Sequence, residues 1–218
     1  MKILFIGDSI TDAGRDRRNY HHLGDGYVRR VAELLTYKMP EMEFEFINMG
    51  ISANRTGQLF DRIHYDAVAF APDVTVILIG INDILRRYKK GESHIETSDE
   101  QIELNCRSIL AQIRKYTASK IIIMSPFFLD PKSNSSFPLD TEGCDCIRRD
   151  VKKAADIIRA LGCKYADDFI PLNILFDDAM KKQPTPQYYS SDGVHPNGNG
   201  ADLIAQRCAE SIIKLLKN

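Results

Sequence analysis

Short apolar segments alternate with longer segments of helical spacing along the whole chain. The apolar segments predict five β-strands, at residues 3–6, 43–48, 74–79, 120–124 and 163–166. The longer segments predict six helices, at residues 27–37, 56–70, 99–116, 144–161, 171–181 and 197–216. This alternation is typical of an α/β fold with a parallel sheet.

The third and fourth predicted strands are the most apolar. Residues 74–79 and 121–123 are continuous runs rich in β-branched residues, as expected for strands that helices cover on both faces. They therefore belong in the middle of the sheet. Gly162 is expected to end the helix that precedes the last strand. Residues 84–98 and 126–141 fit neither pattern and are predicted to be loops at the carboxyl edge of the sheet, where open α/β folds bind ligands.

Composition narrows the class of protein. The 218 residues are 44% hydrophobic, which suits one domain with a large core. The 29 basic and 30 acidic residues give a net charge of −1, so no overall basic field favours nucleic acid or an anionic membrane. The five cysteines are an odd number at unrelated spacings, which fits reduced thiols. With no apolar run of membrane-spanning or signal-peptide length, the expectation is a soluble, cytoplasmic protein.

Ser9 is the first candidate for chemistry. It directly follows an apolar strand, in the turn Gly7-Asp8-Ser9-Ile10-Thr11-Asp12. A serine at the carboxyl edge of a first strand indicates either a nucleophile or a phosphate-binding loop. The plainer interpretation is that the polar side chains of this segment only satisfy backbone donors in a turn.

Asp192 and His195 favour the nucleophile. Near the other end of the chain, the segment Ser191-Asp192-Gly193-Val194-His195-Pro196 supplies a carboxylate and an imidazole three residues apart. A serine nucleophile needs a histidine as its base and a carboxylate that holds that histidine in one tautomer. An Asp-Gly turn followed by a helix cap is the alternative for this segment taken alone. Together with a serine at a strand end, the pattern predicts a serine hydrolase.

Acyl transfer also needs hydrogen-bond donors for an oxyanion. Asn82 follows the third strand, in Gly80-Ile81-Asn82-Asp83, and its amide is expected to point into the same cleft. The loop after the second strand, residues 48–54, is a further source of backbone N–H groups. Four loops are thus predicted to converge at one edge of the sheet.

The four blocks at residues 7–12, 48–54, 80–83 and 191–196, in this order and spacing, resemble the SGNH hydrolases, also called GDSL-type esterases and lipases. The resemblance covers nearly the whole chain. The resemblance implies a three-layer α/β/α sandwich whose central parallel sheet of about five strands is flavodoxin-like. It also implies that Ser9 is the nucleophile, with Asp192 and His195 as its partners. The implied oxyanion donors are the Ser9 N–H, the Asn82 amide and a backbone N–H of the second block. That last position holds Ala53 where the family usually has glycine, and an alanine N–H can still donate.

A closer resemblance is to the bacterial branch similar to acetylxylan esterases. It is carried by the first and third blocks together with Gly14-Arg15, Gly26-Tyr27-Val28, Arg87-Tyr88 and Pro126-Phe127. This resemblance implies removal of acetyl groups from short xylo-oligosaccharides or related sugars, with no cofactor or metal, and a homo-oligomer. Candidates for contact with the sugar are Asp12, Arg87 and Tyr88, with Tyr20 and Tyr27.

Two other functions remain open at this point. Phe127, Phe128, Leu129 and Phe137 could line a groove for a longer acyl chain, which would make the enzyme a lysophospholipase or a thioesterase. A non-catalytic flavodoxin-like module could instead bind a phosphate or a nucleotide at residues 7–12, but that role gives Asn82, Asp192 and His195 no shared task. Metal binding by Cys144/Cys146 or by His21/His22 is the less favoured interpretation, since no second ligand pair is near the cysteines and neighbouring histidines in a polar loop rarely bind metal.

Overall fold

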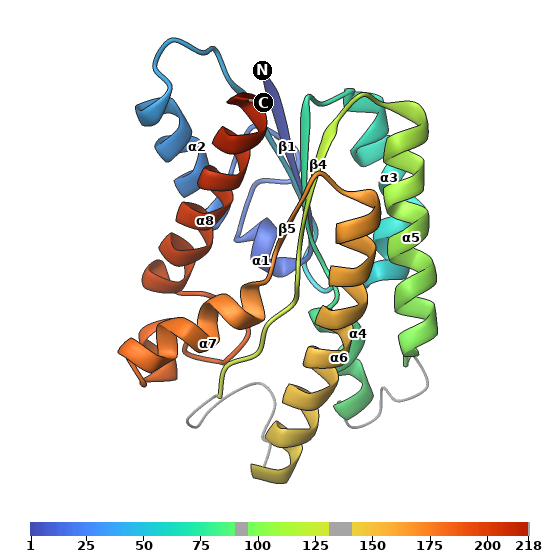
Figure 1. Ribbon diagram of the computed structural model, residues 1–218, viewed down its shortest axis with the longest axis vertical. Coiled ribbons are helices and arrows are strands. Elements are labelled where there is room, and N and C mark those ends of the chain that lie inside the picture. Colours follow the sequence, from blue (N-terminus) through green and yellow to red (C-terminus); the bar gives the residue numbers. More distant parts are fainter. Residues whose placement is uncertain (90–95, 131–140, 218) are drawn as a thin grey trace.

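A single five-stranded parallel sheet organises the computed structural model, which describes residues 1–89, 96–130 and 141–217 (Figure 1). The strand order is β2-β1-β3-β4-β5, the flavodoxin-like order, and every neighbouring pair is parallel. The strands are β1 (Lys2–Gly7), β2 (Glu45–Gly50), β3 (Val74–Leu78), β4 (Lys120–Met124) and β5 (Asp168–Ile170). The predicted α/β class, strand number and order are confirmed.

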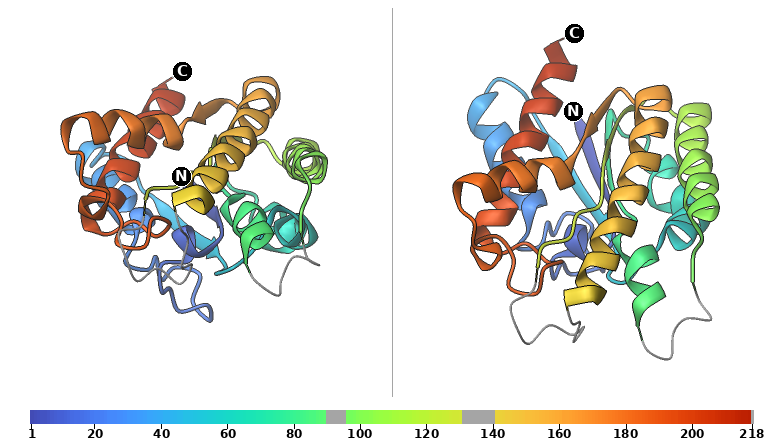
Figure 2. Two further views of the ribbon diagram at one scale, coloured as in Figure 1. Left: turned by 90° about the horizontal axis from the view of Figure 1, so that it is seen from below. Right: turned by 60° about the horizontal axis from the view of Figure 1, so that its bottom comes forward.

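Helices cover both faces of this sheet. The α-helices are α1 (Ser9–Asp12), α2 (Tyr27–Lys38), α3 (Thr56–Asp66), α4 (Ile81–Tyr88), α5 (Asp99–Tyr116), α6 (Thr141–Tyr165), α7 (Leu172–Lys182) and α8 (Gly198–Lys217), with short 3-10 turns η1 (Val68–Phe70) and η3 (Pro186–Tyr188). The views in Figures 1 and 2 place α2 and α8 side by side on one face, and α3, α5 and α6 on the other. The result is the predicted three-layer sandwich.

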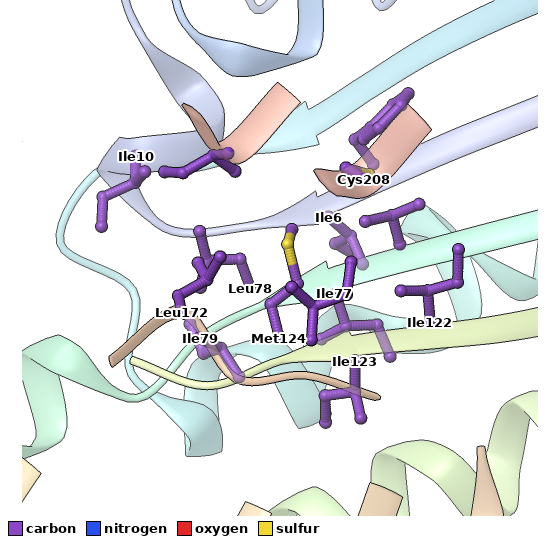
Figure 3. Close-up of a cluster of buried hydrophobic side chains, with 14 of the residues drawn as sticks. Ile6, Ile10, Ile77, Leu78, Ile79, Ile122, Ile123, Met124, Leu172 and Cys208 are labelled. Carbon is purple, nitrogen blue, oxygen red and sulfur yellow. The ribbon is translucent and has the colours of Figure 1, made fainter. Parts of the chain in front are cut away.

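The core lies on both faces of β1, β3 and β4. In register, Ile6 pairs with Ile77 and Ile77 pairs with Ile123, and all three side chains are buried. Figure 3 shows these strands from close by, with Leu172 of α7 and Cys208 of α8 in the same apolar cluster. Burial of branched apolar side chains on both faces explains the continuous hydrophobic runs of the sequence.

The last strand lies later in the chain than predicted. Residues 163–166 were expected to form it, but α6 continues to Tyr165 and β5 begins at Asp168. Gly162 does not end the helix: a Cβ there would lie 2.9 Å from Ile123 Cγ2 and 3.2 Å from Phe169 Cδ2. Glycine at this position therefore permits close contact between α6 and the sheet, which the sequence pattern alone did not distinguish from a helix stop.

Two helices replace segments that were predicted to be irregular. The short helix α1 begins at Ser9 itself, and α4 occupies the start of the predicted loop at residues 84–98. The later part of that loop, residues 90–95, lies outside the described residues, as do residues 131–140 of the predicted loop at 126–141. None of the described helices combines the length and apolar character needed to cross a bilayer.

Candidate active site

Ser9 lies at the junction of β1 and α1. The strand ends at Gly7, Asp8 caps the helix, and Ser9 is the first residue of α1. The Asp8 side chain accepts a hydrogen bond of 3.0 Å from the N–H of Ile10, which satisfies one of the free donors at the start of the helix. The local sequence thus turns the chain sharply at the carboxyl edge of the sheet and leaves the Ser9 side chain partly exposed.

The three predicted triad residues form one hydrogen-bonded series. Ser9 Oγ lies 2.8 Å from His195 Nε2, and His195 Nδ1 lies 2.6 Å from Asp192 Oδ2. About half of the His195 side chain is exposed, so the site opens to solvent. The structure therefore brings together residues 186 positions apart in the chain, in the geometry that a serine nucleophile, its base and an orienting carboxylate require.

The other carboxylate oxygen of Asp192 holds the turn that carries Asp192 and His195. Asp192 Oδ1 accepts hydrogen bonds from the N–H groups of Val194 and His195, at 2.9 and 2.8 Å. Gly193 adopts a φ of 81°, which the tight turn requires. Ser190, which the sequence analysis missed, is fully buried and donates to the His195 carbonyl at 2.8 Å. Its only sequence signal was its place two residues before the aspartate.

Electrostatics favour the charge state that catalysis needs. Burial alone would raise the pKa of Asp192, but hydrogen bonds from His195 and from the backbone of Val194 hold that pKa well below its usual range. The hydrogen bond that His195 donates to Asp192 in turn raises the pKa of His195, against the opposing effect of burial. An ionised Asp192 therefore favours the protonated form of His195.

Ala53 occupies a tight turn after β2. The N–H of Asn54 donates to the carbonyl of Ile51 at 3.2 Å, and Ala53 has a φ of 67°. A positive φ at the third position defines a type II turn, where glycine or asparagine is usual. The N–H of Ile51 donates to the Gly7 carbonyl at 3.0 Å, so this turn is tied to the strand that leads to Ser9.

Asn82 lies against the same turn. Its side-chain amide nitrogen donates to the Asn54 carbonyl at 3.1 Å. The next residue, Asp83, is buried and accepts hydrogen bonds from the Thr56 hydroxyl and N–H, at 2.7 and 3.0 Å. These contacts join the start of α4 to the start of α3 and place the Asn82 amide beside the loop that carries Ala53. Asp83 is a further positioning residue that the sequence analysis did not identify.

Asp12, predicted to contact a sugar, instead makes contacts within the protein. It is buried, and its Oδ2 accepts hydrogen bonds from Ser52 N–H and Oγ, each at 2.9 Å. The Arg17 guanidinium donates to the same oxygen, with Nε at 3.1 Å. Burial opposes ionisation, but these hydrogen bonds lower the pKa of Asp12 and keep it charged. This geometry favours a role in holding the second-block loop, and a sugar contact of Asp12 stays a prediction.

Gly50 allows this loop to approach α1. A Cβ at Gly50 would lie 2.2 Å from the Asp12 nitrogen, so a side chain there would push β2 away from α1. Arg15 donates to the Gly50 carbonyl at 2.8 Å, and Arg62 donates to the carbonyls of Met49 and Gly7 at 2.8 and 2.9 Å. Gly50 is therefore a structural glycine, which supports Ala53 as the oxyanion position.

Asp8 is a buried carboxyl beside Ser9. It is fully buried, and among the described residues its Oδ2 has no hydrogen-bond partner. Burial raises its pKa to about 7, while the N–H of Ile10 and the nearby His195 partly offset this rise. The sequence showed Asp8 only as a turn residue, because burial of an unpartnered carboxylate oxygen has no sequence signal.

Arg87 and Tyr88, the other predicted sugar contacts, lie at the end of α4 and have partners in the protein. Arg87 donates to Asp99 Oδ1 and to the Thr97 carbonyl, both at 2.7 Å. The Tyr88 hydroxyl donates to Asp150 Oδ2 at 2.8 Å. These partners lie in α5, in α6 and just before α5, so the geometry favours a role in joining α4 to α5 and α6. Contact with a sugar stays a prediction for both.

Three of the residues predicted to line a long acyl groove, Phe127, Phe128 and Leu129, are mostly buried and line a pocket of about 600 Å³ whose walls include neither Ser9 nor His195. Phe127 is buried with its ring centroid 4.3 Å from that of Phe176, and the Leu129 N–H donates to the Gly193 carbonyl at 2.8 Å. Phe128 is also buried. Residue 137 lies outside the described residues. In the described part of the chain, no group of three His, Cys, Asp or Glu side chains is placed to hold a metal ion.

The fold is a flavodoxin-like α/β sandwich, and the candidate site has the geometry of a serine hydrolase whose serine directly follows the first strand. Comparison with known proteins identifies the family. The model of the GDSL-like lipase/acylhydrolase family matches residues 5–203, and the chain belongs to that family. It is accordingly a carboxylic ester hydrolase.

Individual relatives agree with this assignment. An acetylxylan esterase from Geobacillus stearothermophilus is 31% identical over 94% of this chain and 90% of that protein. The crystal structure of that bacterium's acetylxylan esterase Axe2 matches with a TM-score of 0.84 and 30% identity, over 97% of this chain and 93% of Axe2. LAE5, an alpha/beta hydrolase enzyme from the metagenome of Lake Arreo, Spain, matches with a TM-score of 0.83 and 25% identity, over 96% and 94% of the two chains. Structures of Axe2 described as catalytic mutants replace a serine, an aspartate or a histidine by alanine.

Proposed function

We propose that this protein is a serine esterase that removes short acyl groups, above all acetyl, from carbohydrates such as xylo-oligosaccharides. The observation that carries the proposal is the series from Asp192 through His195 to Ser9, with distances of 2.6 and 2.8 Å. The substrate class is supported by the similarity to proteins described as acetylxylan esterases.

The triad residues would divide the reaction between them as in other serine hydrolases. Ser9 Oγ attacks the ester carbonyl while His195 Nε2 takes its proton, and Asp192 holds the imidazole in the tautomer with a proton on Nδ1. The tetrahedral intermediate collapses as His195 returns that proton to the leaving alcohol. Water then attacks the acyl-enzyme by the same route, with His195 as base, and releases the carboxylic acid and free Ser9.

Three donors would stabilise the oxyanion: the N–H of Ser9, the N–H of Ala53 and the amide of Asn82. The support for this assignment is the turn at Ala53 and the hydrogen bond of 3.1 Å that places the Asn82 amide against that turn. Removal of one such donor typically lowers kcat by about 10²- to 10³-fold. All three donors follow strands of the sheet, after β1, β2 and β3, and so lie at its carboxyl edge.

The test is hydrolysis of p-nitrophenyl acetate, butyrate and octanoate by the purified protein and by Ser9→Ala. We expect acetate to be the best substrate, Ser9→Ala to lose the activity, and acetate to be released from acetylated xylo-oligosaccharides. A preference for octanoate would support the lysophospholipase or thioesterase alternative instead. Equal rates for the wild type and Ser9→Ala would overturn the nucleophile assignment, and nucleotide binding without turnover would support the non-catalytic alternative.

A further inference from the structure

A small cavity lies directly beside Ser9 and His195. Its volume is about 100 Å³. The residues around it come from α1, the start of α2, the His195 turn and the start of α8: Ser9, Ile10, Ala13, Gly26, Tyr27, His195, Pro196 and Ala201. Of the proposed oxyanion donors, only Ser9 is among them. The cavity is therefore separate from the loops that would hold the carbonyl oxygen, yet it contacts both the nucleophile and the base.

Apart from the catalytic side chains, the wall of this cavity is apolar. Ile10, Tyr27 and Ala201 are buried. The Tyr27 hydroxyl hydrogen bonds to the Thr11 hydroxyl at 3.1 Å, so the polar end of this side chain already has a partner. A polar group of a substrate would find few partners in the cavity and would lose hydrogen bonds to water on entering it.

Small residues keep the cavity open. A Cβ at Gly26 would lie 2.6 Å from Ala13 Cβ, so any side chain at residue 26 would compete for the same space. Ala13 follows α1 in the left-handed conformation, with a φ of 42°, and contributes only a methyl group. Ala201 contributes another methyl group from α8. The size of the cavity thus depends on three positions at which this chain has no large side chain.

The cavity matches an acyl group better than a sugar. Its volume of about 100 Å³ lies between the ~30 Å³ that one water occupies and the ~150 Å³ of a cavity that binds benzene. A pyranose ring with its hydroxyl groups is larger than benzene and strongly polar, so it fits neither the volume nor the wall. When the carbonyl oxygen faces the oxyanion donors, the alcohol part must therefore stay in the open part of the site, and the acyl substituent is the part that can enter.

We propose that this cavity is the acyl-binding pocket and that Ala13, Gly26 and Ala201 limit its occupant to a short acyl chain. The inference rests on the proposed serine esterase function and adds the residues that set its acyl specificity. When an apolar pocket gains or loses room for one methylene group of its substrate, kcat/KM changes by about 10- to 200-fold. Changes of one methyl group at these positions should therefore alter chain-length preference strongly.

The first test is Ala13→Gly, which removes one methyl group from the wall and suits the positive φ at this position. We expect the ratio of kcat/KM for p-nitrophenyl butyrate to that for the acetate to rise about 10-fold. The matched control is Ala71→Gly, because Ala71 also follows a helical turn with a positive φ, of 45°, but does not line this cavity. That control should leave the ratio unchanged.

The second test is Ala201→Val, which adds bulk to the opposite wall. We expect turnover of p-nitrophenyl propionate to fall about 10-fold more than turnover of the acetate. Ala205→Val is the control, since Ala205 is buried one turn further along α8 and is not part of the cavity wall. Thermal unfolding of both valine variants shows whether overpacking, rather than the pocket, changes the rates.

The outcomes separate this inference from the function on which it rests. Ser9-dependent turnover with an unchanged chain-length preference in both Ala13→Gly and Ala201→Val would overturn the pocket assignment and leave the esterase intact. Absence of ester turnover in the wild type, or equal rates in Ser9→Ala, would overturn the proposed function itself. If Ala201→Val does not fold, Ala13→Gly alone decides, because it adds no atoms to the core.

Discussion

Asp12 and Ser52 are joined by two hydrogen bonds of 2.9 Å, both accepted by the same carboxylate oxygen of Asp12. One comes from the Ser52 N–H and the other from its hydroxyl. Ser52 directly precedes Ala53, whose N–H is a proposed oxyanion donor, and Asp12 ends the helix that begins with Ser9. A buried carboxylate thus joins α1, which carries the proposed nucleophile Ser9, to the loop that would complete the oxyanion hole.

We predict that Asp12→Ala lowers kcat by about 10- to 100-fold and changes KM by less than about threefold. The physical reason is that the Ala53 N–H loses its fixed direction, and a donor that stabilises mainly the transition state affects kcat rather than KM. Asp12→Asn should lose less, because its amide oxygen can still accept from Ser52. Steady-state kinetics on p-nitrophenyl acetate measures both effects.

Asp16→Ala is the control for this prediction. Asp16 lies four residues further along, is partly exposed and forms an ion pair with Arg18 rather than with Ser52. Its replacement should leave kcat within about twofold of the wild type. A large rise in KM with unchanged kcat in Asp12→Ala would contradict the positioning role and support direct contact of Asp12 with the substrate.

Asp192→Asn should lower kcat by roughly 10⁴-fold, the effect seen when the carboxylate of a triad becomes an amide that stabilises the wrong histidine tautomer. In a plot of kcat/KM against pH, the midpoint of the acid side should also shift to lower pH. The reason is that the hydrogen bond from His195 to the Asp192 carboxylate raises the pKa of His195, and catalysis needs neutral His195. A pH–rate profile of the residual activity measures this shift, and an unchanged midpoint would argue against the assigned role of Asp192.

Much of this site was visible in the sequence because its parts lie at predictable places. Ser9, Asn82 and the 48–54 loop follow apolar strands, and parallel strands must end at one edge. The spacing of Asp192 and His195 fits a local turn. Asp8, Ser190 and Asp83 acquire their roles only through burial and contacts between separate segments, so their sequence context showed turn residues and nothing more. Asp12 was predicted to contact a sugar, because its contact with Ser52 depends on how two separate segments pack.

The fold was predictable to a similar extent. Its mispredicted parts likewise depend on packing between elements. The apolar runs of β3 and β4 identified the centre of the sheet, since burial on both faces permits few polar residues. The four residues of α1 are too few to show a helical period. Gly162 resembled a helix stop, but it serves contact between α6 and Ile123, a relationship that depends on the packed structure.

Ala53→Gly should leave kcat/KM within a few fold of the wild type and raise stability by up to about 1 kcal/mol. Alanine is strained at a φ of 67° and glycine is not, although glycine adds flexibility to the unfolded chain and offsets part of the gain. Denaturant unfolding and p-nitrophenyl acetate kinetics measure the two quantities. A hundredfold gain in activity would show that the native Ala53 N–H is misplaced for the oxyanion.

Asp8→Asn should change how stability depends on pH. Burial raises the pKa of Asp8 from 3.8 to about 7, so between these values the folded protein binds a proton that the unfolded chain has released. Stability of the wild type is therefore lost through this group as pH rises from 4 to 7, by an amount on the order of 4 kcal/mol. Asparagine does not titrate and should remove that loss.

The measurement is the free energy of unfolding of the wild type and of Asp8→Asn between pH 4 and pH 8. As pH rises, the wild type should lose stability relative to the variant. Kinetics provide an independent check, because ionised Asp8 raises the pKa of His195. In Asp8→Asn the acid limb of kcat/KM should therefore shift to lower pH. If the free energy of unfolding depends on pH in the same way for both proteins, and the acid side of the kcat/KM profile does not shift, then Asp8 does not titrate between pH 4 and pH 8. In that case its place beside Ser9 serves only to cap α1.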